Sequence, residues 1–265
     1  MLEPVKCDNP PVVEVVCGVM FASSVVQAVH IGAFWDRIRS EFPTVEEAPP
    51  LSAIVEEPSQ SVAEFESWAT LPPARRAWLL NRDGSNLIQI QADRFLFNWK
   101  HTLGTKNYPS YQVVITEFER RLQSFMDFMR DIGGVSLIFR QFEMTYVNHI
   151  NKEYGLDQQE ETSILVDHTR QSRTRFLPQP ENFNFSSSYL LPEGAGRLHV
   201  TAQSMNSPLD DTRLVRLDMT ARGMASDASD ESRRKWFDTA HHWITHGFVD
   251  ITSPTVQREI WKRTT

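Results

Sequence analysis

Two long amphipathic segments, each preceded by several short β-type segments, constrain the fold of this 265-residue chain more than any other feature. In the range 111–134, apolar residues such as Val114, Phe118 and Leu122 recur at helical spacing, and two glycines end the pattern. The range 231–249 places its large apolar side chains at the same spacing. Strands that are grouped before a helix, instead of alternating with helices one by one, are typical of the α+β class. The sequence therefore predicts an α+β protein.

The β-type segments are rich in β-branched and aromatic residues and are bounded by turn-forming residues. Asp83-Gly84 lies between two apolar runs, which predicts a hairpin whose strands pair antiparallel. A shorter helix is expected at 30–42, where Pro43 stops the pattern. An irregular proline-rich segment, with a short strand or turn of helix inside it, follows as far as Pro73. The predicted strands are 12–21, 74–81, 87–100, 135–150, 163–168, 184–191, 197–205 and 213–224.

The stretch 87–100 changes phase in its middle. Ile88 and Ile90 are apolar at even positions, whereas the aromatic residues from Phe95 onward occupy odd positions. Two structures produce such a change: a β-bulge at Asp93-Arg94, or the end of one strand and the start of another. A bulge is the preferred interpretation, because no glycine or proline marks a turn there.

The order of the predicted elements repeats along the chain. Residues 1–134 and 135–265 each begin with a strand, continue through further strands and end in one of the long helices. We therefore expect two closely packed α+β halves, which count as one domain or two, with antiparallel sheets each covered by a long helix. The repetition suggests a pseudo-duplication, but the two halves do not align residue by residue.

Composition and charge exclude several classes of function. With 40% hydrophobic residues the chain can bury a substantial core, whereas its formal net charge of −7 opposes a broad nucleic-acid-binding surface. Cys7 and Cys17 are too few for a disulfide framework or a structural zinc site, and free thiols suit a reducing compartment. No apolar run approaches the roughly 18 to 20 residues that cross a bilayer. We therefore expect a cytoplasmic protein that contacts neither membrane nor nucleic acid.

Polar residues alternate along three predicted strands and form a candidate ligand site. Glu143 and His149 share one face of the strand 135–150, His199 lies on 197–205, and Arg216 and Asp218 share one face of 213–224. If these faces coincide, acidic, basic and hydrogen-bonding groups come within reach of one another. The simpler interpretation is a face turned to water, which antiparallel sheets usually have.

A second candidate contact is the polar loop that holds Arg170, Arg173 and Arg175 beside Phe176. Arginines interleaved with an aromatic residue suit phosphate or a stacked single strand of RNA. In an acidic protein, however, a short basic run binds nucleic acid weakly, so a solvated loop is the simpler interpretation.

Three further patterns predict no chemistry. His242 and His246 have the spacing of a metal-binding helix, but Trp243 stands where a zinc protease has glutamate, so no metal site is expected. The serines at 186–188 lie in a predicted strand without a base nearby in the sequence. No glycine-rich phosphate loop or nucleophile elbow occurs either. We therefore predict no catalytic residue and no cofactor.

Several blocks of the sequence together resemble a known family. PPVVEVVCGVMF, LIQIQADRFLFNW, YPSY, EMTYVNHI and HHWITHGFVDIT are similar to blocks of a sporadically distributed family of bacterial proteins of about this length. The resemblance covers nearly the whole chain, but its blocks carry no known chemistry. The patchy occurrence that the resemblance implies fits mobile accessory genes such as defence modules.

These observations lead to three hypotheses of function. The first is a non-enzymatic binding or accessory protein that recognises a protein partner or assembles with itself, because its 7 Trp and 16 Phe suit interfaces as well as cores. The second is a protein that binds a small molecule or nucleotide on the polar strand faces. The third is an enzyme in which Glu143, His149 or His199 performs acid–base chemistry.

Overall fold

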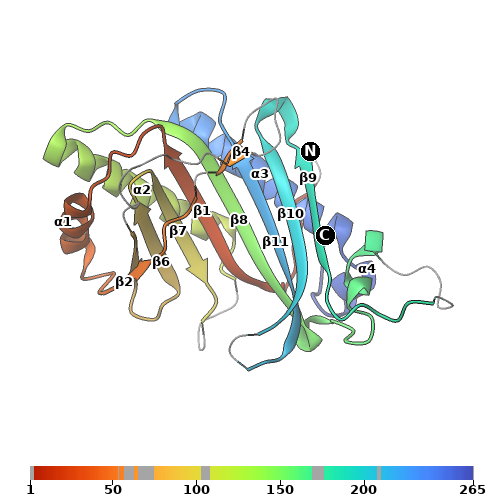
Figure 1. Cartoon of the computed structure of the whole chain (residues 1–265). Helices are drawn as coiled ribbons and strands as arrows, with labels where there is room; N and C mark the ends of the chain where they lie inside the picture. The colour runs from red at the N-terminus through yellow and green to blue at the C-terminus, as the bar shows by residue number, and fades with distance from the viewer. Residues whose placement is uncertain are drawn as a thin grey trace.

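The computed structural model describes residues 3–52, 54–56, 63–64, 75–102, 108–168, 176–207 and 210–264. Within them, nine strands form one antiparallel sheet in the order β2-β5-β6-β7-β1-β8-β11-β10-β9 (Figure 1). An α+β protein with a large antiparallel sheet is thus confirmed. The strands are β1 (Val12–Phe21), β2 (Thr44–Ala48), β5 (Arg76–Leu80), β6 (Asn86–Gln91), β7 (Arg94–Lys100), β8 (Phe139–Asn151), β9 (Asn184–Leu190), β10 (Arg197–Asn206) and β11 (Arg213–Gly223).

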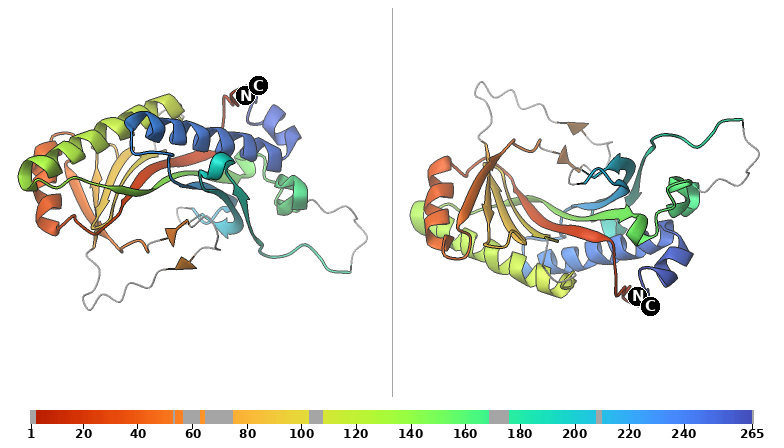
Figure 2. Two further views of the ribbon diagram at one scale, coloured as in Figure 1. Left: turned by 90° about the horizontal axis from the view of Figure 1, so that it is seen from above. Right: turned by 90° about the horizontal axis from the view of Figure 1, so that it is seen from below.

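Both long helices lie on the same face of this sheet, which we call the helix face. Helix α2 packs on β7 and β1, and α3 packs on β11, β8 and β10. Two short paired strands, β3 (Ile54–Val55) and β4 (Ala63–Glu64), lie on the opposite, helix-free face (Figure 2). The helices are α1 (Ala28–Ile38), α2 (Tyr111–Gly133), α3 (Asp230–Ile251) and α4 (Pro254–Glu259), with 3-10 turns η1 (Lys152–Tyr154), η2 (Glu161–Ile164), η3 (Val166–His168) and η4 (Pro192–Gly194).

The two halves of the chain share this one sheet and meet at the pairing of β1 with β8, which we call the seam. In each half the first strand lies at the seam, and the strand that precedes the long helix pairs with it on the outer side. The order from the seam outward is β1, β7, β6, β5 in one half and β8, β11, β10, β9 in the other. The four strands counted outward from the seam therefore follow one another along the chain in the same order in both halves.

The main core fills the space between the sheet and the helices. Phe125 of α2 is fully buried, with its ring stacked on Phe95 of β7 at 5.2 Å and packed edge-on against Phe34 of α1 at 5.0 Å. Each fully buried side chain of this size contributes roughly 1.5–3 kcal/mol relative to an exposed one. Phe95 of β7 thus packs against α2, the long helix of its half of the chain.

The phase change in 87–100 comes from a turn, so the predicted bulge is wrong. Gln91 pairs with Arg94 and Ile90 pairs with Phe95, which leaves Ala92-Asp93 as a two-residue connection between β6 and β7. Because the chain reverses direction, even positions of β6 lie beside odd positions of β7 on one face. Neither turn residue has a positive φ, which explains why no glycine marks it.

A second prediction needs correction, whereas the hairpin is confirmed. Strands β5 and β6 pair antiparallel across the turn that contains Asp83-Gly84. The range 163–168 forms parts of η2 and η3 instead of a strand. Leu165 donates its backbone N–H to the carbonyl of Thr162 and makes an isolated bridge to Thr252, so a helical turn places its buried side chain. No helix in the described ranges is long and apolar enough to cross a membrane.

Candidate functional site

The five polar strand residues predicted as ligand contacts share the helix-free face. In the antiparallel register, His149 of β8 lies beside Arg216 of β11, and His199 of β10 lies beside Thr220 of β11. Paired residues of an antiparallel ladder point to the same face of the sheet. The structure therefore brings together on one face Glu143, His149, His199, Arg216 and Asp218.

Four of these residues interact with an arginine of β11 or with its neighbours: Glu143, His149, Arg216 and Asp218. Glu143 accepts a hydrogen bond at 2.5 Å from Nε of Arg222, its neighbour on β11, and Asp218 accepts one at 2.9 Å from Nε of Arg216. Burial, followed by the positive charge of Arg216, lowers the pKa of His149. The charges of Glu143 and Asp218 are thus balanced by arginines beside them.

His199 differs from the others because both of its ring nitrogens have partners. Its Nδ1 lies 2.8 Å from Oγ of Ser188, the residue that pairs with it on β9, and its Nε2 lies 2.5 Å from Oε1 of Glu56. Glu56 also forms an ion pair with Arg197 at 3.0 Å. Burial alone would raise the pKa of Glu56, but hydrogen bonds from His199 and Arg197 outweigh it and lower that pKa. Sequence reasoning missed Glu56, which comes from a distant irregular segment.

Residues 51–52 and 54–56, which we call the strap, cross the helix-free face and bring Glu56 to His199. Two buried glutamines of the sheet hold the strap by its backbone. Gln91 accepts from the N–H of Leu51 at 2.8 Å and donates to its carbonyl at 3.1 Å. Gln141 accepts from the N–H of Glu56 at 2.7 Å and donates to the carbonyl of Ile54 at 2.8 Å. Each amide thus makes the two bonds that a neighbouring strand would make.

Two predictions of the sequence concern ions or phosphate. The loop arginines predicted as phosphate contacts lie outside the described residues: Arg170, Arg173 and Arg175. Within the described part of the chain, no group of three or more His, Cys, Asp or Glu side chains is arranged to hold a metal ion.

The helix face contains a cavity of about 700 Å³ directly above the seam, which we call the seam cavity. Its floor comes from β1, β8 and β11, one wall from the start of α2, and the opposite wall from α3. The N-terminal arm, Pro4–Pro10, forms a third wall and is held by the C-terminal tail, since Cys7 pairs with Arg263. Lys6 and Asp8 of this arm are the charged groups among the described lining residues.

A chain of hydrogen bonds forms the polar part of the seam cavity. The hydroxyl of Tyr146 on β8 lies 2.7 Å from the hydroxyl of Tyr108 and 3.0 Å from Nδ1 of His241 on α3. The ring of His241 stacks on Tyr111 at 4.0 Å, and Tyr111 donates to Asp238 at 2.6 Å. Rings from three distant segments, β8, the approach to α2 and the middle of α3, therefore meet in one place.

Burial keeps these hydrogen-bonded side chains uncharged. It lowers the pKa of His241 to about 4, although the nearby Asp238 opposes the change. It also raises the pKa of Tyr108 and of Tyr146 well above the usual tyrosine value. Near neutral pH the Tyr108–Tyr146–His241 chain of hydrogen bonds is therefore made of neutral hydroxyl and imidazole groups. These groups can donate or accept a hydrogen bond but offer no charge to a ligand.

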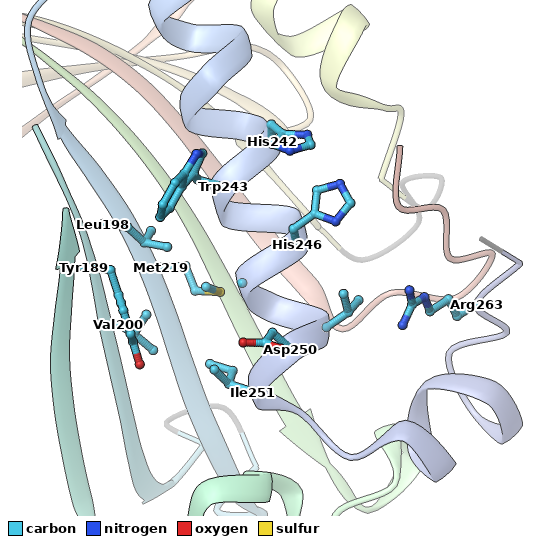
Figure 3. A pocket seen from close by; sticks show the side chains of 12 residues that line it. Tyr189, Leu198, Val200, Met219, His242, Trp243, His246, Asp250, Ile251 and Arg263 are labelled. Atoms are coloured by element: carbon cyan, nitrogen blue, oxygen red, sulfur yellow. The ribbon is translucent and has the colours of Figure 1, made fainter. Parts of the chain in front are cut away.

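A second cavity, of about 530 Å³, lies on the other side of α3 above β9 and β10, and we call it the edge cavity (Figure 3). Trp243 points toward the strands, where Tyr189 and Leu198 line the opposite wall. His242 and His246, which have the spacing of a metal-binding helix, project from the other side of α3 and do not point at the strands. The polar lining of the edge cavity, which includes His242, His246, Asp250 and Arg263, thus differs from the hydrogen-bonded Tyr108–Tyr146–His241 chain of the seam cavity.

Comparison with family models and with curated proteins found no match for this chain. The assignment of function therefore depends on the geometry of the described residues.

Sequence reasoning missed the residues of the seam cavity for a physical reason. Tyr108, Tyr146 and His241 are far apart in the chain, and each by itself looks like an ordinary core or surface residue. The available signal was the tyrosine-rich YPSY block ahead of α2, which carries Tyr108 and Tyr111.

Proposed function

We propose that the protein binds a small, neutral, largely apolar molecule in the seam cavity, with a hydroxyl or carbonyl group of the ligand on the Tyr108–Tyr146–His241 chain. The observation that carries this proposal is the convergence of three hydrogen-bonded polar side chains, one buried and two partly buried, on an otherwise largely apolar cavity. Ligand cavities typically measure about 300–1,000 Å³ and combine apolar walls with a few placed polar groups.

The position of the seam cavity supports the same function. It lies where the two halves of the chain meet, between the start of α2 and the middle of α3. Small-molecule sites occur preferentially at such boundaries between structural units. The uncharged floor argues for a neutral ligand and against a nucleotide, whose phosphates would need several positive groups. The proposed site thus differs in place and chemistry from the polar strand faces that the sequence suggested.

A thermal-shift screen tests the binding function. The probes are neutral aromatic alcohols and ketones, including 2-naphthol, with naphthalene-2-sulfonate as a charged comparison. A ligand present at 100 times its dissociation constant adds about 2.7 kcal/mol to the free energy of unfolding. We expect Tyr146→Phe to weaken binding roughly 2- to 10-fold, because one hydrogen bond contributes about 0.5–1.5 kcal/mol. Tyr189→Phe, in the edge cavity, is the matched control and should bind as the wild type does.

Two outcomes would contradict this function. The first is a screen in which no neutral compound raises the unfolding temperature. The second is a hit that Tyr146→Phe and Tyr189→Phe bind equally well, because such a ligand would not contact the hydroxyl of Tyr146.

Self-association through β9 is a second candidate function, and it continues the sequence-based hypothesis of protein binding. Strand β9 is the last strand of the sheet and carries no charged residue, and Leu190 at its end is 69% exposed. The opposite edge, β2, carries exposed Glu46 and Glu47, which hinder pairing with another strand. A second copy that pairs its own β9 would extend the sheet. Light scattering after size-exclusion chromatography tests this self-association. A role in bacterial defence is a separate proposal, which comes from the resemblance alone.

The repeated path of the chain also supports the proposal of a pseudo-duplication. Strands β1, β7, β6 and β5 with α2 follow the same order as β8, β11, β10 and β9 with α3. Under this proposal, the two long helices and the two seam strands are equivalent elements. The seam cavity would then have formed where two copies of one ancestral unit met.

A further inference from the structure

Ser188, His199 and Glu56 form a continuous row of hydrogen bonds on the helix-free face, away from both cavities. The row runs from Oγ of Ser188 to Nδ1 of His199 at 2.8 Å, and from Nε2 of His199 to Oε1 of Glu56 at 2.5 Å. A hydroxyl within hydrogen-bond reach of a base, with that base oriented by a third group, is the arrangement that activates a nucleophile. His199 thus supplies the base that is not found near the serines 186–188 in the sequence.

The buried acid determines the direction of these hydrogen bonds. The side chain of Glu56 is 3% exposed, and its pKa is lowered, so it is an ionised acceptor near neutral pH. An ionised carboxylate can only accept, and His199 must therefore carry a proton on Nε2. In the neutral imidazole this leaves Nδ1 without a proton, as the acceptor for the Ser188 hydroxyl. The base is thus held in the tautomer that can take a proton from serine.

The position of Ser188 leaves its hydroxyl open to a substrate. Ser188 is exposed on the edge strand β9, whereas His199 is largely buried behind it. An exposed hydroxyl can bond to water, and the ion pair of Glu56 with Arg197 already anchors the strap. The strap is thus held by contacts other than this row. Leu190, two residues along the same strand and strongly exposed, offers an apolar contact for an acyl chain.

We propose that Ser188 is a nucleophile that accepts an acyl group from a carboxylic ester, with His199 as the base and Glu56 as a positioning residue. In the first step Oγ of Ser188 bonds to the carbonyl carbon, its proton passes to Nδ1 of His199, and the ester C–O bond breaks. The alcohol leaves with the proton from His199. In the second step a water molecule loses a proton to Nδ1 of His199 and attacks the acyl carbon. The bond between that carbon and Oγ of Ser188 then breaks, His199 returns the proton to Oγ, and the carboxylic acid leaves.

Covalent labelling with a fluorophosphonate probe tests the nucleophile. Oγ of Ser188 bonds to phosphorus and fluoride leaves, so intact-protein mass spectrometry should show one adduct, and peptide mapping should place it on Ser188. Ser188→Ala should abolish the adduct. Ser186→Ala, an exposed serine on the same side of β9, should label as the wild type does. Loss of the base in His199→Gln should slow labelling by about 10²- to 10⁴-fold.

The role of Glu56 is tested by separating reaction from binding. In Glu56→Gln the first-order labelling rate constant should fall, while the probe concentration at half-saturation should stay the same. A purely structural anchor would change the unfolding temperature without this separation. Hydrolysis of p-nitrophenyl butyrate, with a burst of p-nitrophenol equal to the enzyme concentration, is the expected activity. An unlabelled wild type, or an adduct that persists in Ser188→Ala, would overturn the proposal, and neither result depends on the ligand of the seam cavity.

Discussion

His241 shows how one buried side chain can couple the stability of the protein to pH. Its imidazole is stacked on Tyr111, bonded to Tyr146 and close to Asp238, and burial lowers its pKa to about 4. In the unfolded chain the same group has a pKa of about 6.5. The folded protein therefore holds His241 neutral over a range in which the unfolded chain takes up a proton.

This difference predicts a loss of stability in mild acid. The contribution of His241 is complete above about pH 6.5 and disappears as the pH falls toward 4, because protons then favour the unfolded chain. A shift of this size corresponds to roughly 3 kcal/mol. Urea unfolding at several pH values should show a flatter dependence in His241→Phe than in the wild type. The exposed His101→Gln is the control.

Two other histidines affect the same measurement. Burial also lowers the pKa of His149 and of His246, so both add to the acid sensitivity of the wild type. The difference between wild type and variant, and not the slope itself, therefore measures His241. Equal slopes for the wild type and His241→Phe would show that this imidazole is not held neutral in the fold.

At the scale of elements, the strap determines what the helix-free face presents. Gln141 is buried and bonds to the backbone of both Ile54 and Glu56, which fixes the position of the Glu56 carboxylate. Val55 is the only buried residue of the strap, so these amide bonds matter more than they would in a core strand. Loss of Gln141 should release the end of the strap that reaches His199.

Hydrogen exchange can measure this release at one atom. In Gln141→Ala the amide of Glu56 loses its acceptor and should exchange about 2- to 10-fold faster, as expected for one hydrogen bond of about 0.5–1.5 kcal/mol. Gln203→Ala, on the exposed part of β10, should leave this exchange unchanged. If the Glu56 amide exchanged equally in both variants, Gln141 would not hold the strap.

Local patterns predicted most elements, because their causes lie within a few residues. Asp83-Gly84 indicated a hairpin through turn chemistry, and the apolar spacing of 111–134 indicated a helix through burial of one side. The turn at Ala92-Asp93 escaped prediction because both residues keep an ordinary backbone and need no glycine. The strand predicted at 163–168 was wrong because a short apolar run fits a strand or a buried helical turn equally well.

The candidate sites were harder to predict than the elements, because they depend on contacts between distant segments. Alternation along each strand correctly grouped Glu143 with His149 and Arg216 with Asp218, and the register placed the groups on one face. It gave no indication that Glu56 would reach His199. Nothing local to Tyr146 indicates that its hydroxyl meets groups from two other segments.

At the scale of the whole molecule, one continuous sheet replaces the two sheets expected from the sequence, and its two edges differ. The β9 edge is uncharged and exposed, whereas exposed glutamates protect the β2 edge. An edge without charge is open to pairing with another strand. Association of two copies should therefore use β9 and should leave β2 free.

Substitutions at the two edges distinguish them. The wild type should elute at twice the mass of one chain in size-exclusion chromatography with light scattering. Leu190→Lys should produce the monomer, because a charge on β9 opposes a second copy. Val45→Lys, at an exposed site on β2, should leave the dimer intact. A wild type that is monomeric at every concentration would rule out self-association.

The two ends of the described chain lie side by side, where the backbone N–H of Thr264 donates to the carbonyl of Lys6 at 3.0 Å and that of Asn9 to the carbonyl of Trp261 at 3.1 Å (Figure 2). A short peptide can therefore join them, and the covalent connection between the halves near residue 134 becomes dispensable. A circularly permuted gene that begins with β8 and finishes with α2 would then encode the same set of strand pairings. Affinity tags fused at either terminus, by contrast, would emerge beside the N-terminal arm that lines the seam cavity.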